Sequence, residues 1–307
     1  MSDAEQHFAK AEQRVFARHG LAVTTRAVKL PGPPFRARVL ECGAGRPIVL
    51  VAGDGGIAAA WAPLLAKLPG RRLIVLDRPN FGLGASFDYR GADLRGHGVA
   101  LLNSLLDALG LEAVPIVGSS GGGQWSMWLA LDAPERVRAL APMGSPAVCL
   151  PGFHPDRAMR LLSLPGLGRL MLALPSPSAQ VTGKMMASTD ARLLGHPEIV
   201  EAYHLARRLP GYGSGAAAIF RSSLQIGGRA RRRWVLTEAE LARITQPVLF
   251  VWGDREPYGG PEVARRAAER LPRARVEVIP DAWHHPWLGD PSGVARLLLS
   301  FLAEHDT

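Results

Sequence analysis

The pentapeptide Gly118-Ser119-Ser120-Gly121-Gly122 constrains the fold of this 307-residue chain more than any other feature. It directly follows a short apolar run, Val114 to Val117, and it opens a helix-like segment that continues to Ala133. A serine between two such elements needs small neighbours, because the backbone bends sharply and side chains on either side would collide with the strand and the helix. Only Ser120 lies centrally in a Gly-x-Ser-x-Gly frame, since Ser119 would need a glycine where a valine stands. The pattern predicts a strand–turn–helix unit that presents Ser120 as a nucleophile.

Two later loops carry the partners that such a serine needs. A hydroxyl is a weak nucleophile at neutral pH, so it acts only beside a base that a third group orients. The apolar run 247–252 ends in Gly-Asp-Arg-Glu, and the run 276–279 ends in Pro-Asp-Ala-Trp-His-His. Loops that follow parallel strands gather at one edge of a sheet, where ligands bind. The residues alone leave Glu256 and Asp254 open as the acid, and His284 and His285 open as the base.

Taken together, these segments resemble the cap-bearing branch of the α/β-hydrolase family. Residues 48–53 resemble the family's third strand and the turn after it, and residues 77–86 resemble the loop after the fourth strand. Ser120 then stands at the nucleophile elbow. The resemblance favours Glu256, three positions after Gly253, as the acid and His284 as the base. It covers residues 20–145 and 245–305, and a glutamate replaces the commoner aspartate of the triad.

The resemblance also implies two backbone N–H donors for a negatively charged tetrahedral intermediate. One is Gly121, directly after the nucleophile, and the other is Asp54, in the turn of residues 52–56. Ala52 stands where the family usually has histidine. A carboxylate beside a developing negative charge is unfavourable, so we expect the Asp54 side chain to face away or to bind a polar group of the substrate.

Strand-like and helix-like segments alternate along most of the chain. Uninterrupted apolar strands between helices are typical of a parallel sheet that helices cover on both faces. This rhythm stops between Ser145 and Thr245, a stretch rich in proline, glycine, leucine and methionine. Together with the resemblance, this predicts a mostly parallel, eight-stranded α/β-hydrolase sheet formed by residues 1–145 and 246–307. Residues 146–245 are expected to form a helical lid over the active-site edge, whose methionines line an adaptable apolar pocket or pack the lid onto the core.

The expected chemistry is acyl transfer at Ser120. His284 takes the hydroxyl proton during attack on a carbonyl and returns it to the leaving group, while Glu256 fixes the imidazole tautomer. The resemblance implies a serine hydrolase that cleaves a carboxylic ester, lactone or thioester with an apolar acyl group. Carbon–carbon bond hydrolysis by the same triad, and a non-hydrolytic ligand-binding or cyclase scaffold, are the alternatives. No cofactor and no metal are expected.

The resemblance implies a small-molecule substrate, and the composition indicates no macromolecular partner. The formal net charge of +9 comes mostly from scattered arginines, so no nucleic-acid or membrane partner is predicted. The dense run at residues 229–233 favours a solvated face over an anion site for a phosphate-bearing carrier or an acidic protein. A polar start and the lack of a long apolar stretch predict a cytoplasmic protein. Only Cys42 and Cys149 are present, which predicts neither a disulfide framework nor a metal-ligand cluster.

Overall fold

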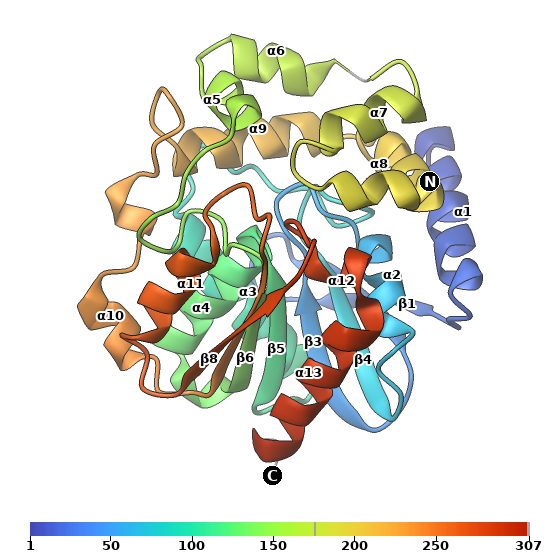
Figure 1. Ribbon diagram of the computed structural model, residues 1–307. Coiled ribbons are helices and arrows are strands. Elements are labelled where there is room, and N and C mark those ends of the chain that lie inside the picture. The colour runs from blue at the N-terminus through green and yellow to red at the C-terminus, as the bar shows by residue number, and fades with distance from the viewer. Residues whose placement is uncertain (175, 306–307) are drawn as a thin grey trace.

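A computed structural model describes residues 1–174 and 176–305 of the protein (Figure 1), so position 175 of the predicted lid and the last two residues of the predicted core lie outside it. Eight strands form one sheet in the order β1-β2-β4-β3-β5-β6-β7-β8. The strands β3 to β8 run parallel, whereas β2 is antiparallel to both β1 and β4. The strand bounds are β1 Thr24–Lys29, β2 Arg36–Cys42, β3 Arg46–Val51, β4 Arg71–Asp77, β5 Val114–Ser119, β6 Val137–Met143, β7 Val248–Gly253 and β8 Ala274–Ile279. The predicted eight-stranded, mostly parallel sheet is confirmed.

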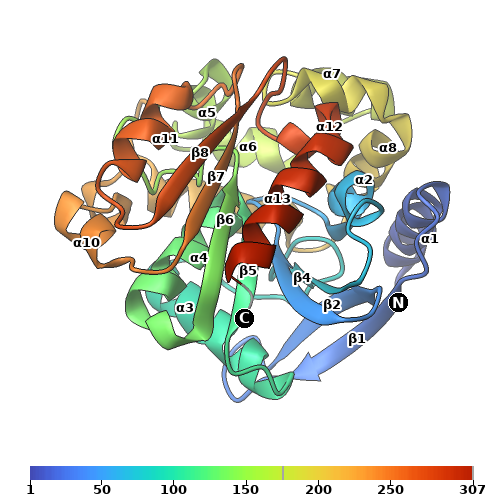
Figure 2. The ribbon, with the colours of Figure 1, turned by 60° about the horizontal axis from the view of Figure 1, so that its bottom comes forward.

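Helices cover both faces of this sheet, as the sequence predicts (Figure 2). Every residue of β5 and β7 is buried, which requires cover on both sides. On one face α13 packs against α2 and α12, and on the other α3 packs against α4. The bounds of these and the remaining core helices are α2 Ala62–Leu65, α3 Leu94–Ala108, α4 Gly121–Asp132, α11 Pro261–Ala268, α12 Pro286–Gly289 and α13 Pro291–His305.

The strand order changes direction at β3, and the candidate site lies beside this strand. The chain leaves β3 for β4 on one side and later enters β5 on the other side of β3. Ligands of open parallel sheets bind beside such a point, at the carboxyl ends of the strands. Residues 52–56 follow β3 and Ser120 follows β5, so both predicted segments meet at this point.

A layer of helices lies over the carboxyl ends of the strands (Figure 1). It comes from the segment between β6 and β7 and contains α5 Arg157–Leu162, α6 Leu167–Ala173, α7 Ala179–Met186, α8 Pro197–Ala206 and α9 Tyr212–Ser223. The helix α10 (Glu238–Arg243) belongs to the same segment but contacts the core, because Glu240 pairs with Arg95 of α3 at 2.9 Å. The division of the chain into core and lid stays a prediction. None of the helices within the described ranges combines the length and apolar character needed to cross a membrane.

Phe8, Ala11, Val15 and Phe16 recur at helical spacing and predict a helix over residues 3–18. The N-terminal helix α1 forms over Asp3–Arg18. A capping box between Ser2 and Glu5 begins it. Arg38 of β2 anchors it to the sheet, because the guanidinium lies between Asp77 and the Glu12 carboxylate of α1, which is 2.6 Å away. The helix also packs against α8 of the overlying layer (Figure 1).

Candidate active site

Ser120 occupies a sharp turn between the end of β5 and the start of α4. Its φ of 49° and ψ of −125° lie in a region that residues with a side chain rarely adopt. The flanking glycines make the turn sterically feasible. A Cβ atom on Gly118 would lie 2.6 Å from the Cα atom of Gly123, and one on Gly122 would collide with the carbonyl oxygen of Val51. The strand–turn–helix unit predicted around Ser120 therefore forms.

The turn after β3 packs directly against the serine. A Cβ atom on Gly53 would lie 2.8 Å from the Cβ atom of Ser120, so only glycine permits this approach. Among the described residues, the N–H groups of Asp54 and Gly121 donate to no other protein group. These two N–H groups beside the serine are thus unpaired within the described residues, and their role as oxyanion donors stays a prediction.

The Asp54 carboxylate pairs with a buried arginine. Its Oδ1 atom lies 2.8 Å from Nη1 of Arg78, whose side chain is only 1% exposed. The Arg78 guanidinium also lies over the ring of Trp125, 3.9 Å from the centroid. Because this cation balances the carboxylate, Asp54 can line the cavity without placing an uncompensated negative charge beside the serine. Nothing in the sequence around Asp54 indicated Arg78 as its partner, since the two residues follow different strands.

Removing the Asp54 carboxylate is expected to destabilise the protein. Asp54→Ala leaves the Arg78 charge buried without its partner, which typically lowers the free energy of unfolding by about 3–5 kcal/mol. Urea denaturation of wild type and variant measures the difference. Asp88→Ala is the matched control, because Asp88 pairs with Arg90 at 2.7 Å on the surface, where solvent screens the charges and such pairs contribute little to stability. Equal losses in the two variants would contradict a structural role of the buried pair.

His284 and Glu256 form a buried pair. The Nδ1 atom of His284 lies 2.9 Å from each carboxylate oxygen of Glu256. The backbone N–H groups of Ser145 and Tyr258 also donate to this carboxylate, at 2.8 and 3.2 Å. Asp254 is exposed, so the structure brings Glu256 and not Asp254 to the imidazole. These three donors hold the carboxylate in place despite the extra methylene of glutamate.

The pair changes the acidity of the imidazole. Burial disfavours the charged ring, but the charge of the Glu256 carboxylate and its hydrogen bond outweigh burial and raise the pKa of His284. The carboxylate holds the proton on Nδ1, which leaves Nε2 as the acceptor. His284 is therefore arranged as a base whose second nitrogen is free to take a proton.

Ser120 and His284 line the same cavity. No hydrogen bond joins their side chains in the described part of the chain. Catalytic hydrogen bonds are often long before substrate binds and shorten in the complex. The structure thus brings Ser120, His284, Glu256, Gly121 and Asp54 to one place, with the serine–histidine contact still open.

The second histidine has a different carboxylate partner. The N–H and Nδ1 of His285 lie 2.7 and 3.1 Å from Oδ2 of Asp190, which is fully buried. Asp190 belongs to the segment over the site, where its other oxygen accepts from the N–H of Arg192 at 2.9 Å. Sequence reasoning missed this pair, because Asp190 lies in a stretch without a recognisable motif. The pairing explains structurally why Glu256 contacts His284 rather than its neighbour.

The cavity has a volume of about 180 Å³ and is mainly apolar. Its apolar lining includes Ile57, Trp61, Val148, Phe153, Met159, Leu162, Met186, Leu193, Phe220 and Trp287. Two of the four lid methionines line it, whereas Met185 is 47% exposed. Asp54 and Asp156 are the carboxylates of the lining, and no lysine or arginine of the described residues belongs to it. This cavity suits a neutral, apolar group.

Known proteins share this architecture. The family model described as alpha/beta hydrolase fold matches residues 46–291. The chain is 29% identical over 285 residues to a 2-hydroxymuconate semialdehyde hydrolase of Pseudomonas sp. (strain CF600), covering 89% of this chain and 92% of that protein. It is 30% identical over 265 residues to a rhodomycin D methylesterase of Streptomyces sp. (strain C5), covering 78% and 85%.

Two solved structures show how far the fold extends. The carboxylesterase CesB of Bacillus subtilis superposes with a TM-score of 0.76 at 22% identity, covering 98% of this chain and 99% of that one. A 2-hydroxy-6-oxo-6-phenylhexa-2,4-dienoate hydrolase from Rhodococcus sp. strain RHA1 gives 0.74 at 20% identity, covering 92% and 99%. At these identities the likeness concerns the fold alone.

Proposed function

Because this chain belongs to the α/β-hydrolase family and is a hydrolase, we propose that Ser120, His284 and Glu256 form its catalytic triad and that it cleaves neutral carboxylic esters with an apolar acyl group. The observation that carries the proposal is the shared cavity: Ser120 and the Glu256-paired His284 face an apolar space without a lysine or arginine among its described lining residues. Lactones and thioesters with the same acyl group fit the same chemistry.

Each step of the proposed reaction has a group to perform it. The Ser120 oxygen attacks the ester carbonyl while Nε2 of His284 accepts the hydroxyl proton. The negative oxygen that forms accepts hydrogen bonds from the N–H groups of Gly121 and Asp54. His284 returns the proton to the departing alcohol, which leaves an acyl group on Ser120. Water then repeats the sequence, so that the acid is released and the serine regains its proton.

The charge of the cavity favours an ester over the carbon–carbon alternative. The relatives that cleave dienoates act on substrates that, by their names, carry a carboxylate. A substrate carboxylate would meet Asp156 in this cavity, because Arg78 already balances the charge of Asp54, and none of the described lining residues is a lysine or arginine that could bind it. The likeness to a methylesterase at 30% identity and to a semialdehyde hydrolase at 29% favours neither reaction, so the choice depends on the charge of the cavity.

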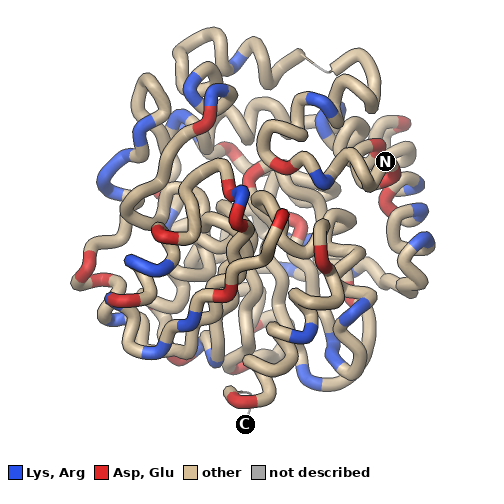
Figure 3. Tube along the Cα trace, in the orientation of Figure 1, with Lys and Arg blue, Asp and Glu red and all other residues tan. Residues whose placement is uncertain are grey.

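The cavity also limits the size of the acyl group. An engineered apolar cavity of about 150 Å³ holds one benzene molecule, and the present volume of about 180 Å³ is only slightly larger. A benzoyl or short branched acyl group therefore fits better than a long fatty chain. The proposed partner is a small molecule. In support, lysines and arginines are distributed along the whole trace, with acidic residues among them (Figure 3).

A substrate panel tests the proposal. We expect kcat/KM for p-nitrophenyl benzoate or butyrate to exceed that for a 2-hydroxy-6-oxodienoate by about 10²-fold or more, because the dienoate carboxylate meets like charge. Decanoate esters are expected to react more slowly than butyrate. Higher kcat/KM for the dienoate than for every ester would overturn the ester assignment and favour carbon–carbon cleavage.

Asp156→Asn is the matched control for the charge argument. Asp156 begins α5, where Oδ1 accepts from the N–H of Met159 at 2.7 Å, and asparagine keeps this cap. The variant is expected to lower KM for a carboxylate-bearing ester and to leave KM for p-nitrophenyl butyrate unchanged. A change of equal size for both substrates would show that the residue acts through the shape of the cavity.

A further inference from the structure

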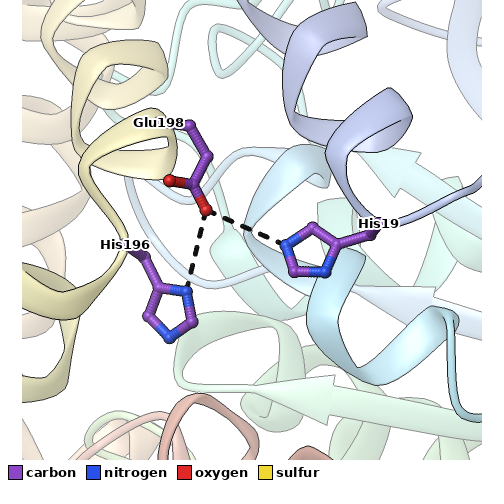
Figure 4. Close-up of side chains that lie close together, drawn as sticks. All are labelled: His19, His196 and Glu198. Atoms are coloured by element: carbon purple, nitrogen blue, oxygen red, sulfur yellow. Dashed lines mark ion pairs between the residues drawn. The ribbon is translucent and has the colours of Figure 1, made fainter.

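His19, His196 and Glu198 lie together where the end of α1 meets the start of α8 (Figure 4). The Oε1 atom of Glu198 lies 3.9 Å from Nε2 of His19 and 3.8 Å from Nδ1 of His196. All three atoms lie within 4.8 Å of one another. These separations are too long for hydrogen bonds, so three atoms that can each bind a metal converge without bonding one another.

Both imidazoles are oriented toward the shared space. Nε2 of His196 lies 3.2 Å from the carbonyl oxygen of Leu288, which can only accept. The proton of a neutral His196 ring is therefore on Nε2, and the lone pair of Nδ1 faces Glu198. Nε2 of His19 is buried and has no hydrogen-bond partner among the described residues. This nitrogen, 3.9 Å from Oε1 of Glu198, is therefore free to bind an ion.

We propose that His19, His196 and Glu198 form a zinc site. Two imidazole nitrogens and one carboxylate oxygen are a ligand set that zinc prefers, with water completing the shell. Zinc bonds of about 2.0–2.2 Å place tetrahedral ligand atoms about 3.4 Å apart, so the two measured pairs need to close by roughly 0.5 Å. The three side chains are 16–22% exposed, which leaves the site open to an ion.

The expectation of no metal site therefore needs revision under this proposal. It rested on the two cysteines, and the three ligands come from segments that are far apart in the sequence. Only the packing of α1 against α8 brings them together. A zinc ion here would join the N-terminal helix to the layer over the active site, and it is independent of the triad.

A basic residue opposes a cation at this place and supplies a diagnostic variant. Nε of Arg18 lies 3.6 Å from Oε1 of Glu198 and competes with an ion for this carboxylate. The Arg18 side chain is 68% exposed, so it can move into solvent when an ion binds. Arg18→Gln removes this competing charge and is expected to tighten zinc binding.

Calorimetric titration of the untagged, full-length protein with zinc chloride tests the proposal. We expect one zinc ion per chain and at least about a 10-fold loss of affinity in both His19→Ala and His196→Ala. His7→Ala is the matched control, because His7 is an exposed residue of α1 outside the cluster. Its affinity is expected to equal that of wild type, and Arg18→Gln is expected to bind more tightly.

Cobalt substitution and thermal melting give readouts that do not depend on activity. Cobalt bound here is expected to show the visible absorption of a low-coordinate ion, and zinc is expected to raise the Tm of wild type but not of His19→Ala. Cys42 and Cys149 are buried with raised thiol pKa values, so neither competes. His284 and His285 remain in every variant. Equal zinc binding by wild type, His19→Ala and His196→Ala, or no binding by wild type, would overturn the proposal.

Discussion

Ser120→Ala is expected to lower kcat for p-nitrophenyl butyrate by about 10⁴-fold or more, with little change in KM. In the proposed mechanism the alanine removes the only atom that forms the acyl-enzyme, whereas the cavity and the two proposed oxyanion donors remain. Alanine is also smaller than serine, so the strained turn at φ 49° persists without a new collision. Steady-state kinetics measure the loss, and circular dichroism checks that the variant folds.

Ser119→Ala is the natural control for this result. Ser119 is the adjacent serine, it is 2% exposed, and it ends β5 instead of standing at the centre of the turn. Its replacement is expected to leave kcat within about tenfold of wild type. A fluorophosphonate probe is expected to label wild type and Ser119→Ala but not Ser120→Ala. An unlabelled wild type would favour a binding or cyclase role for the fold.

Glu256→Gln is expected to lower kcat by about 10³–10⁴-fold, because the wrong imidazole tautomer then becomes accessible and the imidazolium loses its counter-charge. The amide still fills the space and still accepts from one of the two backbone N–H groups, so the protein is expected to fold. Asp254→Asn removes a carboxylate only two positions away, but that side chain is exposed. Its kcat is expected to stay near that of wild type. The reverse ranking would assign the role to Asp254.

Glu256→Gln is also expected to change the pH dependence of kcat/KM. His284 must be neutral to accept the serine proton, so kcat/KM rises as pH increases through the pKa of this ring. Because Glu256 raises that pKa, we expect the acidic limb of wild type to lie above the ordinary histidine value of about 6.5. In Glu256→Gln burial acts without the opposing charge, and the limb is expected to move to lower pH. An unchanged limb would contradict control of His284 by Glu256.

The sequence predicted those parts of the fold whose causes are local. Strands of buried valine, leucine and isoleucine and the glycine-flanked serine follow from composition and steric demands within a few residues. The apolar residues of 58–68 predict one helix, but the chain forms a 3₁₀ turn at Ala58–Trp61 and then α2, which ends at Leu65. The helices α7 and α9 were not predicted, because the glycines, serines and threonine within them have low helix propensity.

The missed parts of the site are pairs between distant segments. Arg78 balances Asp54 and Asp190 binds His285, and no local sequence pattern predicts either contact. The same holds, outside the active site, for the approach of His19 to Glu198. Each pair depends on the packing of the overlying layer or on the order of the strands in the sheet. Neither can be read from residues that are neighbours in the sequence. The choice between Glu256 and Asp254 was open in the residues themselves for the same reason.

The contact between Asp190 and His285 ties the segment over the cavity to the loop that carries His284. If residues 187–195 moved away from the core, the fully buried carboxylate of Asp190 would lose its partner His285, and the loop that carries His284 would be displaced. We therefore expect residues 187–195 to keep their position during turnover. Redesign of the enzyme for bulkier substrates then has to begin with α5 and α6, where Leu161, Leu167 and Leu170 already face solvent.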